Sequence, residues 1–530
     1  MKNHRNFIVS FAWAMALATL GVHPVAAAER ARPNVLLIVA DDLGFSDLGS
    51  YGGEIRTPNL DRLAGEGARF TQFYNCSVCV STRASLMTGL FPRRDGELRS
   101  DMVTLGEVMQ QAGYATGLSG KWHLGQATPL RPIDRGFAEY YGIMSGASNY
   151  FDPSVRDPKF YDGEGRGRPF GHNETIVTKF PPGYYTTDAF ADHTITMIRQ
   201  SAANRKPFFL NLNFTAPHFP LQVPAADVVR YREKYRDGYQ RLREDRFRRQ
   251  IQLGILDPEN TKLSPVHAKG GGSRYDFPVS SWEQLSPEDR RREEERMEVY
   301  AAMVDRLDQA VGRVLAALEE AGVANNTVVF FISDNGGCAG GPEYGEPYLK
   351  FNEAIPVGDG RGYEFVGPGW GWAQNAPFRR HKTWTYEGGV ATPMIVRWPG
   401  VVPSGKMIKT PAHVLDFMPT LLELSGGQYP ENFQGRPILP LEGRSLVPIL
   451  KGAADAKRPA PLYWELFGNR AMRDGDWKTV WNATDRRWEL YDLASDRSET
   501  LDLSARYTDR VTAMAAAWSA WYERKEAPGK

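Results

Sequence analysis

The sequence predicts an α/β fold with a mostly parallel central sheet flanked by helices, and a smaller antiparallel sheet near the C-terminus. Continuous apolar runs recur along most of the chain, helical patterns separate them, and short segments divided by turn residues replace them after about residue 455. Strands that alternate with long helices are typical of a parallel sheet. Uninterrupted apolar runs are typical of strands buried on both faces.

The expected strands of the central sheet are four apolar runs bounded by polar or turn residues. They cover residues 34–40, 207–213, 327–332 and 393–397. The clearest helix is predicted over residues 293–320, because its apolar side chains recur at the period of one helix face. Gly322 follows this pattern and is expected to end the helix.

Two stretches lack the pattern of buried elements. Residues 227–296 carry many charges of both signs that nearly cancel, which favours a solvated helical insertion. Residues 339–376 are rich in glycine, proline and aromatic residues and have no periodicity. Because loops of this length are usually functional or disordered, we expect this one to form the rim of a pocket. Its aromatic residues include Tyr344, Tyr348, Trp370 and Trp372.

The pattern beyond residue 455 predicts a separate small sheet. Short segments at 471–473, 477–481 and 488–492 are divided by turn residues, as in antiparallel hairpins. Residues 511–521 then have the pattern of a closing helix. The expected organisation is a leader, a main domain and a C-terminal subdomain, with bounds at 1–28, 29–455 and 456–530.

The first 28 residues have the pattern of a secretory signal peptide. Lys2 and Arg5 precede an apolar run at 7–20, and Ala26–Ala28 offers a small-residue cleavage site. The alternative is a retained membrane anchor, which needs about 20 apolar residues to span a bilayer. No other stretch is long and apolar enough to span one. We therefore expect an exported protein, periplasmic or secreted, without a stable membrane anchor.

Charge and cysteine content narrow the function. The formal net charge is +1, from 64 basic and 63 acidic residues, so the composition does not indicate a nucleic-acid or membrane-surface partner. With three cysteines the chain has no disulfide framework. Cys76 and Cys79 form a C-x-x-C pair, but a zinc site lacks a second ligand pair and a redox site lacks the expected small βαβ context.

Polar side chains follow two of the expected strands. Asp41 and Asp42 come directly after the first run, and Asp334 and Asn335 follow the run at 327–332. Ligands of open α/β sheets gather beyond the carboxyl ends of the strands. Carboxylate and amide oxygens are hard ligands that suit Ca²⁺ or Mg²⁺. Helix caps or solvated turns are the alternative for each pair alone.

Cationic and titratable side chains lie near other strand ends. Lys121 and His123 follow a segment ending at Ser119, His218 follows the run at 207–213, and Lys382 precedes the run at 393–397. Solvated lysines and structural histidines are the alternative for each of them. Cations that converge with a metal imply a compact anionic substrate group, such as sulfate, phosphate or phosphonate.

Cys79 is the candidate nucleophile. It precedes Arg83 by four residues at the start of a probable helix, where the helix dipole and the guanidinium favour an anionic nucleophile. The run from Cys79 to Gly89, Cys-x-x-x-Arg-Ala-Ser-Leu-Met-Thr-Gly, resembles the signature of type I sulfatases, and the other motifs occur in that family's order. They are Asp41-Asp42, Gly120-Lys-Trp-His-Leu-Gly125, Ala216-Pro-His218, Ser333-Asp-Asn-Gly336, and Lys382 before Glu387-Gly-Gly389.

The resemblance covers nearly the whole mature chain and is strongest to bacterial arylsulfatases. It implies an alkaline-phosphatase-like fold, with residues 29–455 as the catalytic domain and 456–530 as the C-terminal subdomain. It also implies that a formylglycine-generating enzyme converts Cys79 to formylglycine. The hydrated aldehyde then attacks the sulfur of an aryl or carbohydrate sulfate monoester and expels the alcohol.

The resemblance further implies the site residues. One Ca²⁺, with Mg²⁺ as the alternative, is held by residue 79 together with Asp41, Asp42, Asp334 and Asn335. Arg83 and Lys121 orient the hydrate beside His123. His218 and Lys382 bind the sulfate oxygens, and one of them protonates the leaving oxygen.

The signature departs from the family at Ser81, where the family normally has proline or alanine. Serine lacks the fixed φ of proline, so this residue bears on how the peptide fits the maturing enzyme. Two other functions fit the same motifs. One is a phosphodiester or phosphonate monoester hydrolase on the same scaffold, and the other is an unmatured, non-catalytic binder of sulfated ligands.

Overall fold

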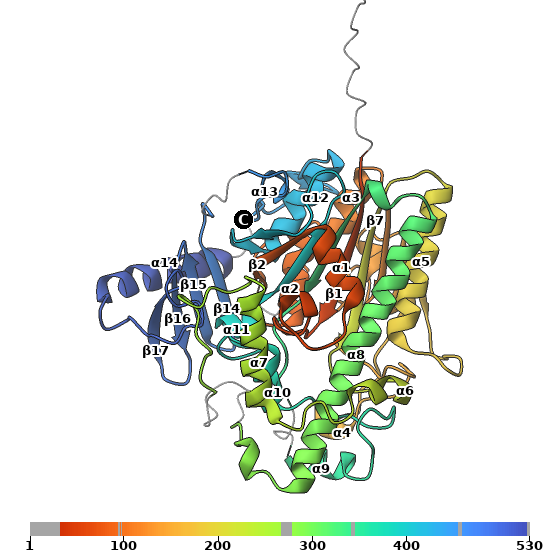
Figure 1. Cartoon of the computed structure of the whole chain (residues 1–530). Coiled ribbons are helices and arrows are strands. Elements are labelled where there is room, and N and C mark those ends of the chain that lie inside the picture. Colours follow the sequence, from red (N-terminus) through yellow and green to blue (C-terminus); the bar gives the residue numbers. More distant parts are fainter. Residues whose placement is uncertain are drawn as a thin grey trace, which may run out of the picture. The chain divides into compact units, whose positions relative to one another are not determined.

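The computed structural model describes residues 32–93, 96, 98–266, 278–340, 345–453 and 458–526. Its main feature is a large mixed sheet in the strand order β10-β2-β9-β8-β1-β7-β3-β4-β5-β6, with β11 beside β2 (Figure 1). The strands are β1 (Asn34–Asp41), β2 (Ala68–Tyr74), β3 (Ala115–Gly120), β4 (Glu139–Ile143), β5 (Phe170–His172), β6 (Thr175–Ile176), β7 (Phe208–Pro217), β8 (Thr327–Ser333), β9 (Ala391–Arg397), β10 (Lys406–Ile408) and β11 (Ala412–His413). Strands β8, β1, β7, β3 and β4 are parallel neighbours, while β9 runs antiparallel to β8 and β2. The predicted mostly parallel sheet is confirmed.

The central strands separate two hydrophobic cores. In β1, Leu36 and Ile38 belong to one core, while Val35, Leu37 and Val39 belong to the other. Side chains of a strand point alternately to opposite faces, so a strand covered on both faces must be apolar at every position. This explains why the expected strands are uninterrupted apolar runs.

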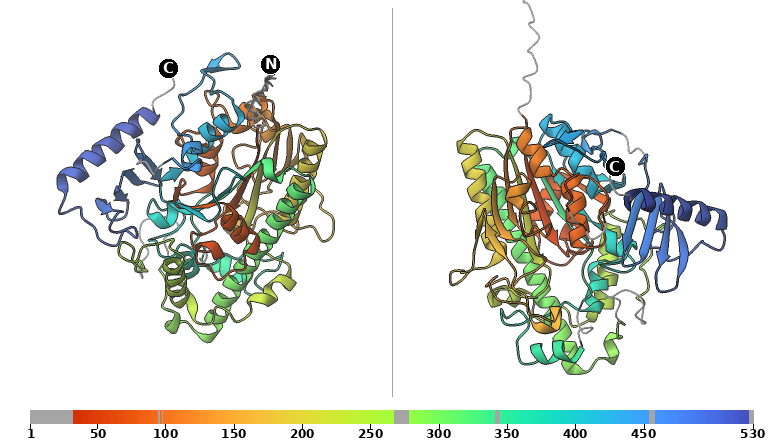
Figure 2. Two further views of the ribbon diagram at one scale, coloured as in Figure 1. Left: turned by 45° about the horizontal axis from the view of Figure 1, so that its top comes forward. Right: turned by 180° about the vertical axis from the view of Figure 1, so that it is seen from behind.

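Helices cover both faces of the sheet. On one face α8 packs against α5, α1 and β7, and on the other face α12 packs against α2 and α3 (Figure 2). The helices are α1 (Pro58–Glu66), α2 (Cys79–Thr88), α3 (Leu105–Gln111), α4 (Lys159–Asp162), α5 (Thr186–Ala203), α6 (Ala225–Val228), α7 (Gly238–Gln252), α8 (Pro287–Glu320), α9 (Gly345–Asn352), α10 (Pro368–Gln374), α11 (Glu387–Val390), α12 (Phe417–Ser425), α13 (Val447–Leu450) and α14 (Thr508–Glu526). The predicted helix at 293–320 is thus the C-terminal part of α8. Its start lies at Pro287 because the Ser286 hydroxyl caps the backbone N–H of Asp289 at 3.0 Å.

Two interpretations from composition are corrected. The charged stretch 227–296 is helical, but Arg243 and Arg246 of α7 are fully buried, so it is more than a solvated insertion. Residues 339–376 include α9 and α10, so the segment is not a loop throughout. Trp370 and Trp372 are buried in an apolar cluster, whereas Tyr348 also borders a cavity of about 570 Å³. Tyr344 lies outside the described residues.

The predicted small antiparallel sheet is confirmed near the C-terminus. Its four strands are β14 (Leu462–Leu466), β15 (Asn469–Asp474), β16 (Trp477–Asn482) and β17 (Arg487–Asp492), and α14 packs on them. A two-stranded ribbon, β12 (Asn432–Phe433) with β13 (Arg436–Pro437), precedes it. The expected signal peptide and the expected boundary at 455 lie outside the described residues. Within those residues, none of the helices combines the length and the apolar character needed to cross a bilayer.

A buried ion-pair cluster joins the small sheet to the segment before β9. Lys478 of β16 lies between two carboxylates, 2.9 Å from Glu387 and 2.8 Å from Glu499, and all three side chains are buried. The Tyr74 hydroxyl donates a further hydrogen bond to Glu387 at 2.8 Å. Removing one partner of a buried ion pair leaves an uncompensated charge, which costs more than the pair itself contributes.

We therefore expect Lys478→Met to lower the free energy of unfolding by about 3–5 kcal/mol, because two carboxylates remain buried without their shared cation. Equilibrium urea unfolding measures this loss. The control is Lys350→Met, which removes a lysine exposed on α9 and is expected to change stability by less than about 0.5 kcal/mol. Equal effects of the two substitutions would contradict the structural role of Lys478.

Candidate active site

The carboxyl ends of four adjacent parallel strands form the floor of the site. In the order β8, β1, β7 and β3, these strands are followed or ended by Asp334, Asp41, His218 and Lys121. All four side chains are buried. The expectation that these strand ends meet is therefore confirmed by the sheet order.

Two buried carboxylates of the floor are paired with cations from different segments. The Lys121 Nζ donates to Asp41 Oδ2 at 2.5 Å. The Arg83 guanidinium donates to Asp334 Oδ2 from both Nε (3.1 Å) and Nη2 (2.8 Å), and from Nη1 to the carbonyl of Lys121 at 3.0 Å. Arg83 and Lys121 are thereby fixed with respect to each other.

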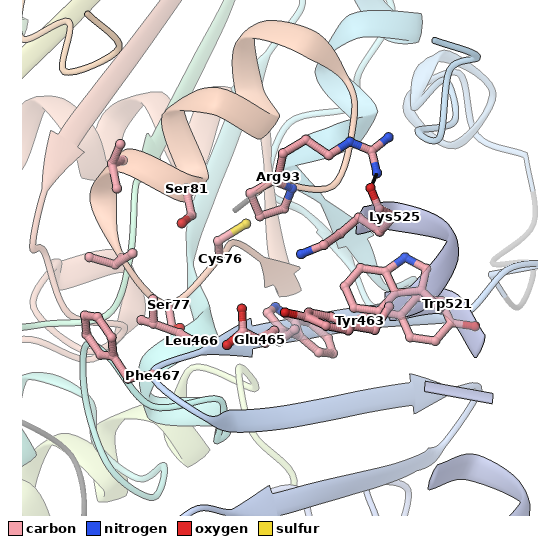
Figure 3. Close-up of a pocket in the computed structure, with 15 residues that line it drawn as sticks. Cys76, Ser77, Ser81, Arg93, Tyr463, Glu465, Leu466, Phe467, Trp521 and Lys525 are labelled. Atoms are coloured by element: carbon pink, nitrogen blue, oxygen red, sulfur yellow. Dashed lines mark hydrogen bonds between the residues drawn. The ribbon is translucent and has the colours of Figure 1, made fainter. Parts of the chain in front are cut away.

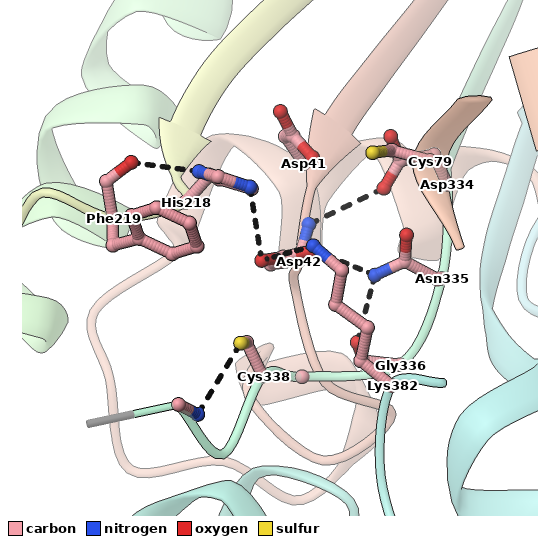
Figure 4. A network of polar contacts seen from close by, with 12 residues as sticks. Asp41, Asp42, Cys79, His218, Phe219, Asp334, Asn335, Gly336, Cys338 and Lys382 are labelled. Atoms are coloured by element: carbon pink, nitrogen blue, oxygen red, sulfur yellow. Dashed lines mark hydrogen bonds and ion pairs between the residues drawn. The ribbon is translucent and has the colours of Figure 1, made fainter. Parts of the chain in front are cut away.

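The third carboxylate, Asp42, is shared by several side chains (Figure 4). Lys382 Nζ donates to both of its oxygens, at 2.7 and 2.9 Å. The Asn335 amide donates to Oδ1 at 2.6 Å, and His218 Nε2 lies 3.5 Å from Oδ2. Burial raises the pKa of Asp42, but the opposing effects, of which the charge of Lys382 is the largest, outweigh burial and the pKa is lowered. Asp42 is therefore ionised.

Cys79 begins α2 and faces this floor. Its Sγ lies 3.4 Å from His123 Nδ1, and Arg83 follows it one helical turn later. Burial raises the pKa of the Cys79 thiol, although Lys121 and Lys382 act in the opposite direction. The thiol is thus a weaker nucleophile at neutral pH than its position at a helix N-terminus suggests.

Backbone conformation at the site is unusual. Asp42 and His123 both have φ of 62°, a left-handed conformation that non-glycine residues rarely adopt. Gly120 ends β3 with φ of 111°, and a Cβ there would lie 1.8 Å from the carbonyl oxygen of Asn213. The strand end therefore requires glycine, and the tight approach places Lys121 beside β7, where its N–H bonds to Asn213 at 2.8 Å.

The charges of the side chains on the floor of the site nearly cancel. Burial, and next the negative charge of Asp41, raise the pKa of Asp334 to about 6. Burial also lowers the pKa of His123 and His218 well below the usual range, so both imidazoles are neutral. Three carboxylates then face three cations, which are Arg83, Lys121 and Lys382.

The donor set fits a hard divalent cation. Asp41 Oδ1 and Asn335 Oδ1 are buried oxygens without a hydrogen-bond partner among the described residues. Ligand atoms of Asp41, Asp42 and His218 also lie within 4.8 Å of one another. Unpaired buried oxygens are costly, and Ca²⁺ or Mg²⁺ would satisfy them. The residues present therefore fit the metal that the sequence predicts.

A cavity of about 190 Å³ opens above the floor. Its lining combines the predicted site residues Cys79, His123, His218 and Lys382 with Tyr161 and Arg168 of the tyrosine-rich segment 140–185, which the sequence suggests as part of the leaving-group pocket. The lining residues that sequence reasoning missed include Phe219, Cys338, Thr383 and Phe467. Phe467 belongs to the β14–β15 turn, so the small sheet contributes to the cavity. No motif marks these residues, because each reaches the cavity only through the tertiary fold.

A second cavity, of about 410 Å³, is lined by the segment around Cys76 and by residues of β14 and α14 (Figure 3). Cys76 and Ser81 line this cavity, together with Arg93, Tyr463 and Trp521. The Cys76 thiol contacts the Ser85 hydroxyl at 3.5 Å, and no disulfide joins any of the three cysteines. Cys76 and Cys79 thus face different cavities, which leaves no support for a C-x-x-C redox pair.

Comparison with known proteins gives matches over most of the chain. The Sulfatase family matches residues 33–427, and the C-terminal region of N-sulphoglucosamine sulphohydrolase matches residues 378–516. A Schizosaccharomyces pombe protein described as an uncharacterized sulfatase is 34% identical, with 93% of each chain covered. An arylsulfatase of Klebsiella aerogenes is 32% identical over 80% of this chain and 93% of its own. The crystal structure of Ps i-CgsB in complex with k-i-k-neocarrahexaose has a TM-score of 0.66 and 26% identity, with 93% of each chain covered.

The thiols differ in accessibility, and we expect a maleimide or iodoacetamide to modify Cys338 well before Cys76 at pH 8. Cys338 lines the open cavity, whereas burial raises the pKa of Cys76 to about 11. Because the thiolate is the reactive form, Cys76 should react about 100-fold more slowly than an ordinary thiol. Peptide mass spectrometry over time measures both rates. In urea-unfolded protein the two should react alike, and equal rates in the folded protein would contradict this assignment.

Proposed function

The chain belongs to the sulfatase family, and we propose that it hydrolyses a sulfate monoester with a nucleophile derived from Cys79 and one bound Ca²⁺, for which Mg²⁺ is the alternative. The observation that carries this proposal is the cavity above the strand ends. Cys79 and Lys382 line it, and Arg83 and Lys121 lie directly beneath them. A sulfate ester resists attack because its oxygens are negative, so cations around the nucleophile favour the reaction.

The nucleophile is proposed to be formylglycine, formed from Cys79 by a formylglycine-generating enzyme. The hydrated aldehyde supplies a hydroxyl that attacks sulfur, a role for which a buried thiol of raised pKa is poorly suited. Arg83 and Lys121, which are fixed by Asp334 and Asp41, are proposed to orient the hydrate at residue 79. His123, neutral and 3.4 Å from the sulfur, accepts or donates a hydrogen bond there.

The metal is proposed to lie among Asp41, Asp42, Asp334, Asn335 and residue 79. When bound, Ca²⁺ polarises the sulfate group and favours the ionised nucleophile. The two unpartnered oxygens, on Asp41 and Asn335, support this ligand set. Because the floor is nearly neutral without the metal, a divalent cation leaves an excess of positive charge that matches an anionic substrate.

Sulfate binding is assigned to His218 and Lys382. The Lys382 ammonium stays charged, because burial lowers its pKa but the surrounding acidic groups, Asp42 first among them, together raise it well above the usual range. The imidazole of His218 contacts the Phe219 carbonyl through Nδ1 at 2.7 Å, which leaves Nε2 on the side of Asp42. One of these two residues is proposed to protonate the leaving oxygen; Lys382 carries a proton at neutral pH, whereas the imidazole of His218 is neutral.

The leaving group is proposed to be an aryl or carbohydrate alcohol. Aromatic rings of Tyr161, Phe219 and Phe467 line the cavity and suit the flat face of a ring. The complex of Ps i-CgsB with an oligosaccharide supports the carbohydrate alternative. We also propose export after cleavage of the leader, a catalytic domain up to residue 455, and a C-terminal subdomain that supplies Phe467 to the cavity.

Substitution of the two neighbouring cysteines tests the nucleophile. We expect Cys79→Ala to lower kcat for an aryl sulfate by about 1,000-fold or more, because it removes the group that attacks sulfur. Cys76→Ala is the matched control and should leave kcat within about threefold, since Cys76 faces the other cavity. Circular dichroism and thermal unfolding confirm that both variants fold.

Mass spectrometry of the peptide covering residues 70–93 completes this test. An aldehyde or hydrate at residue 79 in active protein supports the proposal. A persistent thiol in a protein that binds sulfated ligands without turnover would contradict it and favour the non-catalytic binder. Faster turnover of a phosphodiester than of the matching sulfate ester would favour the phosphodiester or phosphonate hydrolase.

Asp334→Ala tests the metal site. Because this change removes a carboxylate from the ligand set, we expect Ca²⁺ affinity to fall at least 10-fold and turnover to be lost. Isothermal titration calorimetry measures the affinity. The control is Asp305→Asn, which changes a buried aspartate on α8 that accepts a hydrogen bond from Tyr231. Undiminished Ca²⁺ affinity in Asp334→Ala would exclude Asp334 as a ligand.

A further inference from the structure

A second group of ligand-type side chains lies on the sheet away from the cavity. Glu139 begins β4, His172 ends β5, and His193 lies on α5. Their ligand atoms all lie within 4.8 Å of one another. Two imidazoles and one carboxylate form a donor set different from the oxygen-rich floor of the active site, because imidazole suits zinc, copper and nickel.

The distances between the three groups are compatible with a shared metal ion. His172 Nε2 and His193 Nε2 each lie 3.3 Å from the same oxygen, Glu139 Oε1, and the first of these contacts is a long hydrogen bond. Zinc bonds of about 2.0–2.1 Å in a tetrahedral arrangement place neighbouring ligand atoms about 3.3 Å apart. The two imidazoles therefore face the carboxylate oxygen at the spacing of a shared ion.

Neighbouring side chains orient all three groups. The Tyr141 ring stacks on His193 at 5.1 Å and meets His172 edge-on at 5.6 Å. The Asn173 amide donates to the other oxygen of Glu139, Oε2, at 3.2 Å, which leaves Oε1 turned to the imidazoles. The hydrogen bond from Asn173 is the kind of partner that orients a ligating carboxylate in known metal sites.

The partial exposure of these three side chains to solvent leaves room for an ion and a fourth ligand. The His193 side chain is 12% exposed, whereas those of Glu139 and His172 are 35% and 52% exposed. The site is thus open to solvent on one side, so a water molecule can complete the coordination.

We propose that Glu139, His172 and His193 bind a divalent transition metal, with Zn²⁺ as the probe. The ion would link the short strand β5 to α5 and to the start of β4. Strand β4 leads directly to Gly146 and Ala147 of the active-site cavity, and its end bonds to the backbone of Trp122 and His123. The metal would therefore hold β4, β5 and α5 together next to one wall of the cavity.

The test uses the full-length protein, stripped of metal with a chelator and then saturated with Ca²⁺ to occupy the oxygen-rich site. Zn²⁺ is titrated by calorimetry, and Co²⁺ absorption reports four-coordinate geometry. His172→Ala is the first variant, because its side chain is largely exposed and its loss should not impair folding. Glu139→Gln is compared with Glu174→Gln, a matched change at an exposed carboxylate two residues beyond His172.

The wild type and Glu174→Gln are expected to bind one Zn²⁺ more than His172→Ala. Glu139→Gln should weaken this binding at least 10-fold. Zn²⁺ should also raise the unfolding midpoint of the wild type and not that of His172→Ala. Zn²⁺ binding that is identical in wild type and His172→Ala, or absent from both, would overturn the proposal. These readouts do not depend on turnover, so they stand apart from the proposed sulfatase activity.

Discussion

Three aspartate side chains buried at one edge of the sheet impose the main constraint on this structure. Burying a carboxylate is costly unless a cation or several hydrogen bonds compensate it. Here each carboxylate takes its cation from a different segment. Asp334 is paired with Arg83 from α2, Asp41 with Lys121 beyond β3, and Asp42 with a lysine before α11. Because those segments are far apart in sequence, neutralising the carboxylates also assembles the site.

Much of this arrangement can be predicted from the sequence. Residues that follow apolar runs must share one edge, since parallel strands end on the same side of a sheet. Strand direction therefore suffices to group Asp41, Asp334 and His218, and it places Lys121 with them. Cys79 is expected at a helix start, and α2 begins there. Position in the sequence is informative for these residues because the end of a strand or the start of a helix determines where each one lies.

Other features could not be predicted, because they depend on partners distant in sequence. Arg246 sits in a stretch of mixed charge, and composition does not reveal that Glu54 and Asp47 accept its hydrogen bonds inside the protein. Trp370 belongs to a segment without periodicity, yet its ring packs against Tyr239 and Trp282 of other elements. The local sequence indicates the secondary-structure propensity of a segment. Whether residues such as these are buried depends on the side chains that the fold packs against them.

The small C-terminal sheet is tied to the site through two contacts of the same segment. Lys382, which reaches Asp42, lies five residues before Glu387, and Glu387 is held by Lys478 of β16. The turn between β14 and β15 in that sheet carries Phe467 into the wall of the cavity. A shift of the sheet would therefore move a cation at the floor and an aromatic ring at the wall together. This linkage explains why a buried lysine is placed between two carboxylates here, where an apolar contact would fix position less strictly.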